Sequence, residues 1–185
     1  MNDRPWCILA DVLPTTVDIG GQRHVIDTRT STAICCLRRL RENLPDELAM
    51  AYVSKRLGLP VTIESREAAI WFLCGPQTGP QSKQGGQAVF DYFQDAALVV
   101  AAFRQSYGMD LQGMLDLHWW EFLTLLQGMP HDTRLSEVMD IRAMPIDPKE
   151  PRETQARKRR AKRSVALHDS KSAEEQLQDA LSSLL

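Results

Sequence analysis

The chain has 185 residues, of which 43% are hydrophobic and 25% charged, and its formal net charge at pH 7 is −2. This length and composition predict one ordinary globular domain with tails, whose core needs no disulfide or metal for stability. They exclude a protein that binds polyanions through its bulk charge. No apolar run approaches the roughly 20 residues that a membrane span needs.

The cysteines favour a reducing compartment. There are four, Cys7, Cys35, Cys36 and Cys74, and no two have the C-x-x-C spacing of a zinc knuckle or a redox turn. Because the N-terminus does not resemble a signal peptide, we expect four reduced thiols in a cytoplasm. We expect neither a metal nor a cofactor.

The first predicted element is a β-hairpin. Residues 16–19 and 23–26 alternate as half-buried strands do, and Gly20 and Gly21 between them supply the positive φ of a tight turn. A lone hairpin is marginally stable in water, so its apolar residues must pack on a larger body. The residues expected to do so are Val17, Ile19, Val25 and Ile26.

A helix is predicted directly after the hairpin. Ser31 or Thr32 is expected to cap it at its N-terminus. Apolar residues then recur at spacings of three and four, which is typical of one buried helix face. That face consists of Ile34, Leu37, Leu40 and Leu44.

Two further helices and a loop complete the first half of the chain. One helix is predicted from Glu47 to Leu57, with Gly58 as its C-cap, and the next from about Ser65 to Gly75. Residues 75–87 contain no large apolar side chain, which predicts a surface loop.

Three helices are predicted in the second half. The first covers Asp91–Tyr107 and ends at Gly108. The second, Leu115–Leu126, is apolar on nearly every side and is therefore expected at the centre of the core. The third runs from about Thr133 to Met144, with Asp132 or Thr133 as its N-cap.

The character of the chain changes after Pro151. Residues 152–163 can form a helix, but their basic side chains point in every direction, so we expect this helix in solvent. Residues 172–185 form an amphipathic segment. The sequence therefore predicts a mainly α protein: a single helical domain over residues 1–148 with a small N-terminal β-hairpin, and a charged helical C-terminal extension over residues 149–185.

Two groups of polar residues are candidates for a catalytic or metal site. Asp91 and Asp95, one helical turn apart, could share a metal, but an ordinary solvated helix face is favoured. His118 and Glu121 have the spacing of an acid/base pair on a helix, but a core helix built on the two adjacent tryptophans is favoured. No phosphate loop or nucleophile motif occurs. We therefore predict a protein that is not an enzyme and has no catalytic residues.

The C-terminal extension is the candidate partner-binding region. Its basic run could contact phosphates, but it lacks interleaved aromatic residues, so a solvated tail or a patch for an acidic protein partner is favoured over nucleic acid. The leucine-rich end either packs on the body or enters a partner's groove, and the sequence leaves both open. The candidate partner-binding residues are Arg157, Arg160, Arg163, Leu177, Leu181 and Leu184.

Three motifs in fixed order resemble one known family. They are Phe103-Arg104-Gln105-Ser106-Tyr107-Gly108-Met109-Asp110-Leu111, Leu117-His118-Trp119-Trp120-Glu121-Phe122, and Gly128-Met129-Pro130-His131-Asp132-Thr133. The chain resembles, over roughly residues 13–145, the bacteriophage family catalogued as gene product fifteen. Its members are small proteins encoded beside the tape-measure gene of long-tailed phages and prophages.

The resemblance implies a role in tail assembly, as a chaperone that coats the tape-measure protein until the tube polymerises. Expected partners are the tape-measure protein and other tail proteins, with self-association left open. The expected location is the host bacterial cytoplasm during phage assembly, and whether the protein stays in the virion is also open. The alternative is a small DNA-binding or regulatory phage protein that uses its basic C-terminal segment.

The resemblance also implies a set of structural determinants in the matching motifs. They are Phe103, Tyr107, Gly108, Asp110, His118, Trp119, Trp120, Asp132, Thr133 and Arg142. We expect Arg142 to pair with a carboxylate such as that of Asp110.

Overall fold

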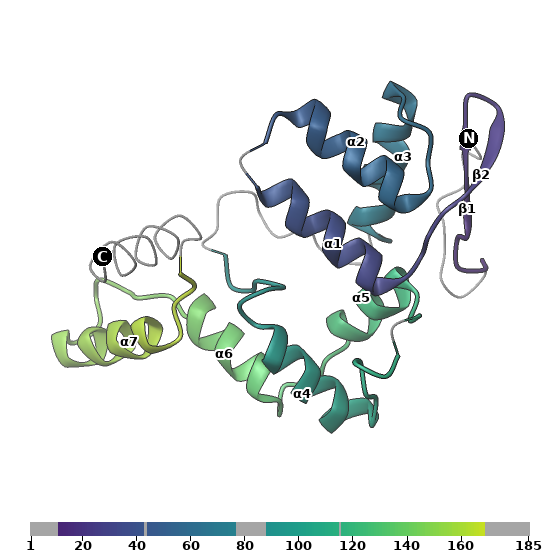
Figure 1. Ribbon diagram of the computed structural model, residues 1–185. Coiled ribbons are helices and arrows are strands. Elements are labelled where there is room, and N and C mark those ends of the chain that lie inside the picture. The colour runs from purple at the N-terminus through teal and green to yellow at the C-terminus, as the bar shows by residue number, and fades with distance from the viewer. Residues whose placement is uncertain (1–10, 43, 77–87, 115, 169–185) are drawn as a thin grey trace, which may run out of the picture. The chain divides into compact units, whose positions relative to one another are not determined.

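Figure 1 shows the computed structural model, which describes residues 11–42, 44–76, 88–114 and 116–168. The elements in chain order are β1 (Thr16–Ile19), β2 (Gln22–Val25), α1 (Thr30–Arg41), α2 (Asp46–Leu57), α3 (Ile63–Cys74), α4 (Ala96–Tyr107), α5 (Trp119–Gln127), α6 (Arg134–Ala143) and α7 (Arg152–Ser164). The described chain is mainly helical with an N-terminal antiparallel hairpin, as predicted.

The chain divides into two compact units. The first unit consists of Met1–Ser82 and Phe103–Met129, and the second of Lys83–Ala102 and Pro130–Leu185. One division therefore falls inside α4. The sequence-based boundary between residues 148 and 149 stays a prediction.

The hairpin forms at the predicted turn. Gly20 and Gly21 have φ values of 58° and 79°, the positive φ that a two-residue hairpin loop requires. Val17, Ile19 and Ile26 are buried as expected, but the prediction for Val25 is wrong, since it is 72% exposed. Val25 pairs with Thr16, and cross-strand partners share a face. It therefore lies on the face opposite to Val17 and Ile19.

The start of α1 differs from the prediction. The helix begins at Thr30 with Arg29 as a cap that makes no side-chain hydrogen bond, so neither Ser31 nor Thr32 caps it. The Thr32 hydroxyl instead donates to Asp27 at 2.9 Å. The buried residues of α1 are Thr32, Ala33 and Cys36, whereas Leu40 of the predicted apolar face is exposed.

Caps define the ends of α2 and α3. Gly58 ends α2 with φ 78°, as predicted. The Thr62 side chain accepts a hydrogen bond from the Ser65 backbone N–H, so α3 begins at Ile63, slightly earlier than predicted. Of the predicted loop over residues 75–87, all but Gly75 and Pro76 lies outside the described residues.

The helices of the second half begin later than predicted because side chains cap them. The Asp91 carboxylate accepts hydrogen bonds from the backbone N–H groups of Phe93 and Gln94, which holds a turn before α4 begins. His118 is the N-cap of α5, which starts at Trp119 rather than Leu115. Thr133 caps α6, as expected for that position.

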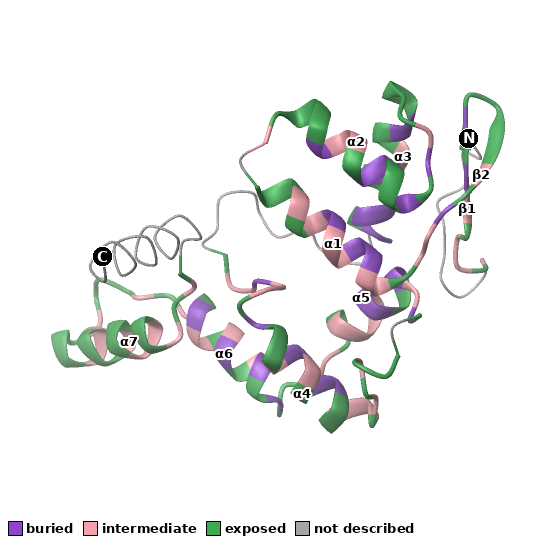
Figure 2. Cartoon of the chain, viewed as in Figure 1, coloured by how far each residue is buried: buried purple, intermediate pink, exposed green. Residues whose placement is uncertain are grey.

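Buried residues occur on each of the helices α1 to α6 (Figure 2). α7 forms over the predicted basic run and has no buried residue. The amphipathic segment over residues 172–185 lies outside the described residues. No helix in the described ranges combines the length and apolar character that crossing a membrane requires.

The thiols that the structure describes are free. Cys35, Cys36 and Cys74 form no disulfide, as expected, and Cys7 lies outside the described residues. Burial raises the pKa of the Cys36 thiol to about 12, so this side chain stays protonated and packs as a small apolar residue.

Asp27 binds Arg29 and Thr32 at the start of α1, and its pKa is lowered. The Arg29 side chain donates to the Asp27 carboxylate at 2.9 and 2.6 Å. This hydrogen bonding is the main cause that lowers the pKa of Asp27 from 3.8 to about 2. The hydrogen bond from Thr32 adds to the effect, and burial opposes it.

A carboxylate with a depressed folded-state pKa stabilises the fold above its unfolded pKa, and this contribution is lost as the pH falls through the folded value. We expect Asp27→Asn to lower Tm at pH 7 by more than at about pH 2. An equal Tm difference at both pH values, measured by thermal unfolding, would contradict this assignment.

Candidate functional site

Two tryptophans of α5 form the centre of the first unit. Trp119 and Trp120 are almost fully buried, and their indole N–H groups donate to the backbone carbonyls of Leu73 at 3.0 Å and Phe72 at 2.8 Å. These carbonyls belong to the last turn of α3, where the helical N–H four residues on is missing, although the Phe72 carbonyl also accepts from the Gly75 backbone N–H. The two side chains therefore bury large area and satisfy the end of a neighbouring helix, which confirms the interpretation of α5 as a core helix.

His118 connects α5 to the start of the chain. Its Nδ1 accepts a hydrogen bond from the Trp120 backbone N–H at 3.1 Å, so Nε2 carries the proton and donates to the Pro14 carbonyl at 3.0 Å. His118 also lies opposite Arg29 in an isolated antiparallel bridge. Both ring nitrogens are engaged in holding the fold, while Glu121 is exposed. That the protein is not an enzyme stays a prediction.

The remaining motif residues of the first unit hold the end of α4. The Phe103 ring stacks on Phe122 with centroids 5.2 Å apart, and the Tyr107 hydroxyl donates to the Leu125 carbonyl at 2.8 Å. Gly108 has φ 65° and its N–H donates to the Arg104 carbonyl, as a C-cap does. Asp110 pairs with Arg104 at 3.0 Å on the surface.

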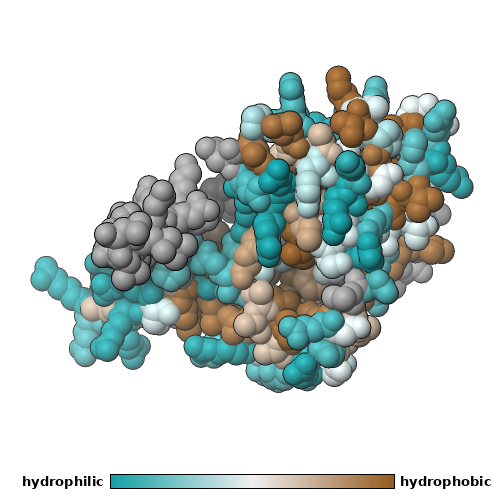
Figure 3. Space-filling view, in the orientation of Figure 1, coloured by the Kyte–Doolittle hydropathy of each residue, from teal (hydrophilic) through white to brown (hydrophobic). Residues whose placement is uncertain are grey.

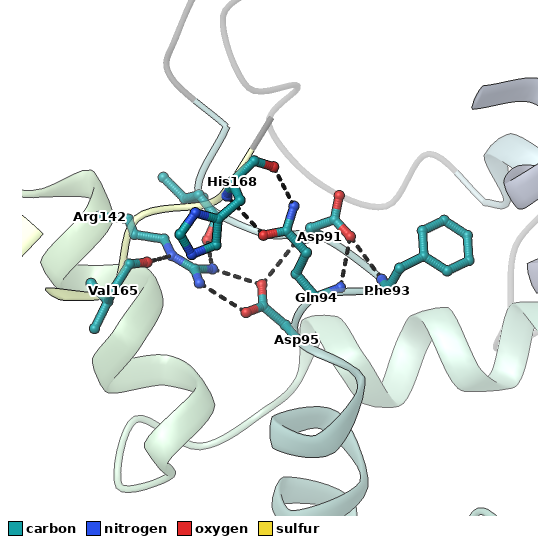
Figure 4. A network of polar contacts seen from close by, with 8 residues as sticks. Asp91, Phe93, Gln94, Asp95, Arg142, Val165 and His168 are labelled. Atoms are coloured by element: carbon teal, nitrogen blue, oxygen red, sulfur yellow. Dashed lines mark hydrogen bonds and ion pairs between the residues drawn. The ribbon is translucent and has the colours of Figure 1, made fainter. Parts of the chain in front are cut away.

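The second unit is organised around a buried ion pair (Figure 4). The Arg142 guanidinium donates to the two carboxylate oxygens of Asp95 at 2.6 and 2.9 Å, and both side chains are less than a tenth exposed. The expected pairing of Arg142 with Asp110 is therefore wrong. The expectation of a solvated face for Asp91 and Asp95 is also wrong, because both are buried and Asp95 accepts from the Asp91 backbone N–H at 2.9 Å.

The same network holds the chain that follows α7. Arg142 also donates to the backbone carbonyls of Val89 at 3.0 Å and Val165 at 2.5 Å. The Gln94 side-chain amide exchanges two hydrogen bonds with the His168 backbone, at 2.6 and 2.8 Å. Three segments of the second unit, residues 89–95, α6 and residues 165–168, are thus joined through one guanidinium and one amide.

α7 separates its lysines from its arginines. Lys158 pairs with Glu150 at 2.5 Å and also donates to the Pro145 carbonyl, and Lys162 donates to the Met144 carbonyl at 3.1 Å. The arginines make no such contact with the described residues, and all of them are exposed: Arg152, Arg157, Arg159, Arg160 and Arg163. The lysines therefore attach the helix to its own unit, and the arginines face solvent.

A surface hollow of about 750 Å³ lies along one side of α7. Its lining comprises Ile146, Arg152, Gln155, Ala156, Arg159, Lys162 and Arg163. Of the candidate partner-binding residues, Arg163 lines it, while Arg157 and Arg160 are exposed elsewhere on the helix. Leu177, Leu181 and Leu184 lie outside the described residues. Arg152 and Arg159 are not among the residues that the sequence predicts for partner binding. Arg159 follows Arg152 by seven positions and Arg163 follows it by eleven, so the three residues lie on one stripe of the helix.

The described residues offer no cluster of three or more His, Cys, Asp or Glu side chains that could hold a metal ion. What the arrangement presents is two kinds of surface: charged arginines on α7 and, on the first unit, exposed apolar side chains.

Comparison with known proteins agrees with the motif resemblance. No curated protein and no solved structure matches the chain. The family model described as Bacteriophage Gp15 protein matches residues 9–167, which include the tryptophan core, the Arg142–Asp95 pair and α7. The chain therefore belongs to the Bacteriophage Gp15 protein family.

Proposed function

We propose that this protein acts in phage tail assembly as a chaperone that binds the tape-measure protein in the host cytoplasm. The family supplies the phage setting. The observation that carries the binding role is the distribution of exposed apolar side chains. We further propose that the protein works by binding alone, without catalysis.

Among the described residues, every exposed large apolar side chain lies in the first unit. Seven of them fall between residues 40 and 71, on α1, α2, α3 and the α2–α3 connection: Leu40, Leu48, Tyr52, Val61, Ile63, Ile70 and Trp71. Figure 3 shows hydrophobic atoms at the surface over α2 and α3. Exposed apolar side chains gathered on neighbouring helices are typical of a surface that binds another protein.

The spacing of these residues indicates what kind of segment they bind. Leu48 and Tyr52 are four apart on α2, and Ile63 and Ile70 are seven apart on α3, so each pair lies on one stripe of its helix. Apolar stripes on two packed helices form a surface against which an amphipathic helix can lay its apolar face. A long, apolar partner that must be kept from aggregating before assembly could be held by such a surface.

Co-expression of the full chain with the tape-measure protein of the same phage tests the proposal. We expect the partner to be soluble only in the presence of this protein and to co-purify with it. The variant Leu48→Ser/Ile63→Ser/Ile70→Ser should lower the co-purified amount at least about tenfold, since each serine removes apolar contact area.

The matched control changes three other exposed apolar residues of the same unit, Val12→Ser/Val25→Ser/Met114→Ser. It should co-purify the partner as well as the wild type does, with circular dichroism showing that both variants fold. A partner whose solubility does not depend on this protein would refute chaperoning, and equal losses in the two variants would refute the α2–α3 surface.

A further inference from the structure

The arginines of α7 lie on two different sides of the helix. At about 100° per residue, Arg152, Arg159 and Arg163 fall within roughly 40° of one another and span about 16 Å along the axis. Arg157 and Arg160 lie roughly 80–140° from Arg152, on the same side as Glu153. The first three line the hollow, and we name them the arginine face.

Among the described residues that line the hollow beside the arginine face, none is a carboxylate. Glu150 is engaged by Lys158, and the Asp147 carboxylate accepts a hydrogen bond from the Lys149 backbone N–H. Glu153 lies on the other side of the helix. Among the residues that the structure describes, no carboxylate forms an ion pair with an arginine of this face, which leaves its charge for a partner to meet.

The hollow also contains apolar surface. Ile146, which precedes α7, and Ala156 on the helix lie among the arginines, and the aliphatic stems of arginine add further apolar area. The hollow thus combines guanidinium groups, which bind carboxylates with two parallel hydrogen bonds, and an apolar floor that can receive a side chain such as leucine.

From this combination we propose that the arginine face of α7 is a docking surface for an acidic, amphipathic helical segment of a partner protein. Carboxylates at spacings of four and seven on such a helix would meet Arg159, Arg163 and Arg152, whose own spacings are four and seven. A leucine beside them would enter the hollow at Ile146. The surface belongs to the second unit and does not depend on the proposed binding of the tape-measure protein by the first.

Nucleic acid fits this surface less well. Phosphates would be attracted by the arginines, but the described part of the chain places no aromatic side chain in the hollow to stack on a base. An apolar floor contributes nothing to phosphate binding. A duplex carries charge at regular, short intervals along its axis, so it would require no particular spacing of the arginines along α7.

Fluorescence anisotropy with the full chain tests the proposal. The probe is a labelled amphipathic peptide of roughly 20 residues, about 30 Å long as a helix, with glutamates at spacings of four and seven beside a leucine stripe. Comparison probes are a peptide of the same composition in scrambled order and a random-sequence oligonucleotide, single-stranded and duplex. We expect the patterned peptide to bind at least about fivefold more tightly than the scrambled one.

Two double variants remove the same charge from different sides of α7. Arg159→Gln/Arg163→Gln should weaken binding of the patterned peptide about tenfold, and Arg157→Gln/Arg160→Gln by less than about threefold. Glutamine keeps helix propensity, so circular dichroism should be unchanged in both. Ile146→Ala should weaken peptide binding while leaving binding of the oligonucleotide unchanged.

The outcomes that would overturn the proposal are distinct. Equal losses in the two double variants would mean that only net charge matters. Tighter binding of the oligonucleotide than of the patterned peptide would assign the surface to nucleic acid. Absence of peptide binding by the wild type at low salt, where charge attraction is strongest, would remove the docking surface altogether.

Discussion

Replacing Arg142 by alanine is expected to lower the free energy of unfolding of the second unit by about 3–5 kcal/mol, because the change leaves the Asp95 carboxylate buried without its counter-charge. The backbone carbonyls of Val89 and Val165 lose a donor in the same step. Urea unfolding followed by circular dichroism measures the loss. The tryptophans that the structure describes, Trp71, Trp119 and Trp120, belong to the first unit, so their fluorescence reports on that unit separately.

A matched control lies on the same helix. Arg134 pairs with Glu137 at 2.6 Å, but both side chains are more than half exposed, so Arg134→Ala should cost less than about 1 kcal/mol. The double variant Arg142→Met/Asp95→Leu should be more stable than Arg142→Ala, since it removes the stranded charge together with its partner. If Arg142→Ala costs no more than Arg134→Ala, the buried pair does not organise this unit.

The elements that sequence could predict are those determined by neighbouring residues. Gly20 and Gly21 at the hairpin, Gly58 and Gly108 at helix ends and Thr133 as a cap all act through backbone conformation or hydrogen bonds within a few residues. The apolar character of residues 115–126 likewise predicts that the tryptophans of α5 lie in the core, because a helix that is apolar on nearly every side is stable only when buried, and both side chains are buried.

What sequence could not predict depends on contacts between distant segments. Asp95 and Arg142 are 47 positions apart, and nothing in the spacing of Asp91 and Asp95 distinguishes a buried carboxylate from a solvated one. Charge alone makes Asp110 a reasonable partner for Arg142, but Asp110 pairs with Arg104, six residues away.

The same limit applies to α7. The run of basic residues gave no reason to separate lysine from arginine, since both are cations of similar length. Only the positions of Met144, Pro145 and Glu150 show that Lys158 and Lys162 are used within the unit. The arginines that remain exposed are therefore distinguished by tertiary contacts and not by the pattern of the run.

The tryptophan core yields the second large effect. Trp119→Ala is expected to lower the free energy of unfolding of the first unit by about 3–5 kcal/mol, since it removes a fully buried ring that stacks on Phe122 with centroids 5.4 Å apart. Chemical denaturation followed by circular dichroism measures this loss. The exposed Trp71 offers a control, because Trp71→Ala opens less of a cavity and should cost clearly less.

Conservative replacements separate the hydrogen bonds of the indoles from their bulk. The Phe72 carbonyl, which accepts from Trp120, also accepts from the Gly75 backbone N–H at 3.2 Å, so Trp120→Phe leaves it one donor. The Leu73 carbonyl accepts from Trp119 at 3.0 Å in the last turn of α3, where helix carbonyls lack intrahelical donors. We therefore expect Trp119→Phe to cost about 1–3 kcal/mol and Trp120→Phe less, because a buried acceptor without a donor carries its full desolvation penalty. The reverse order in denaturation experiments would show that ring packing, and not the satisfied end of α3, determines the stability of this core.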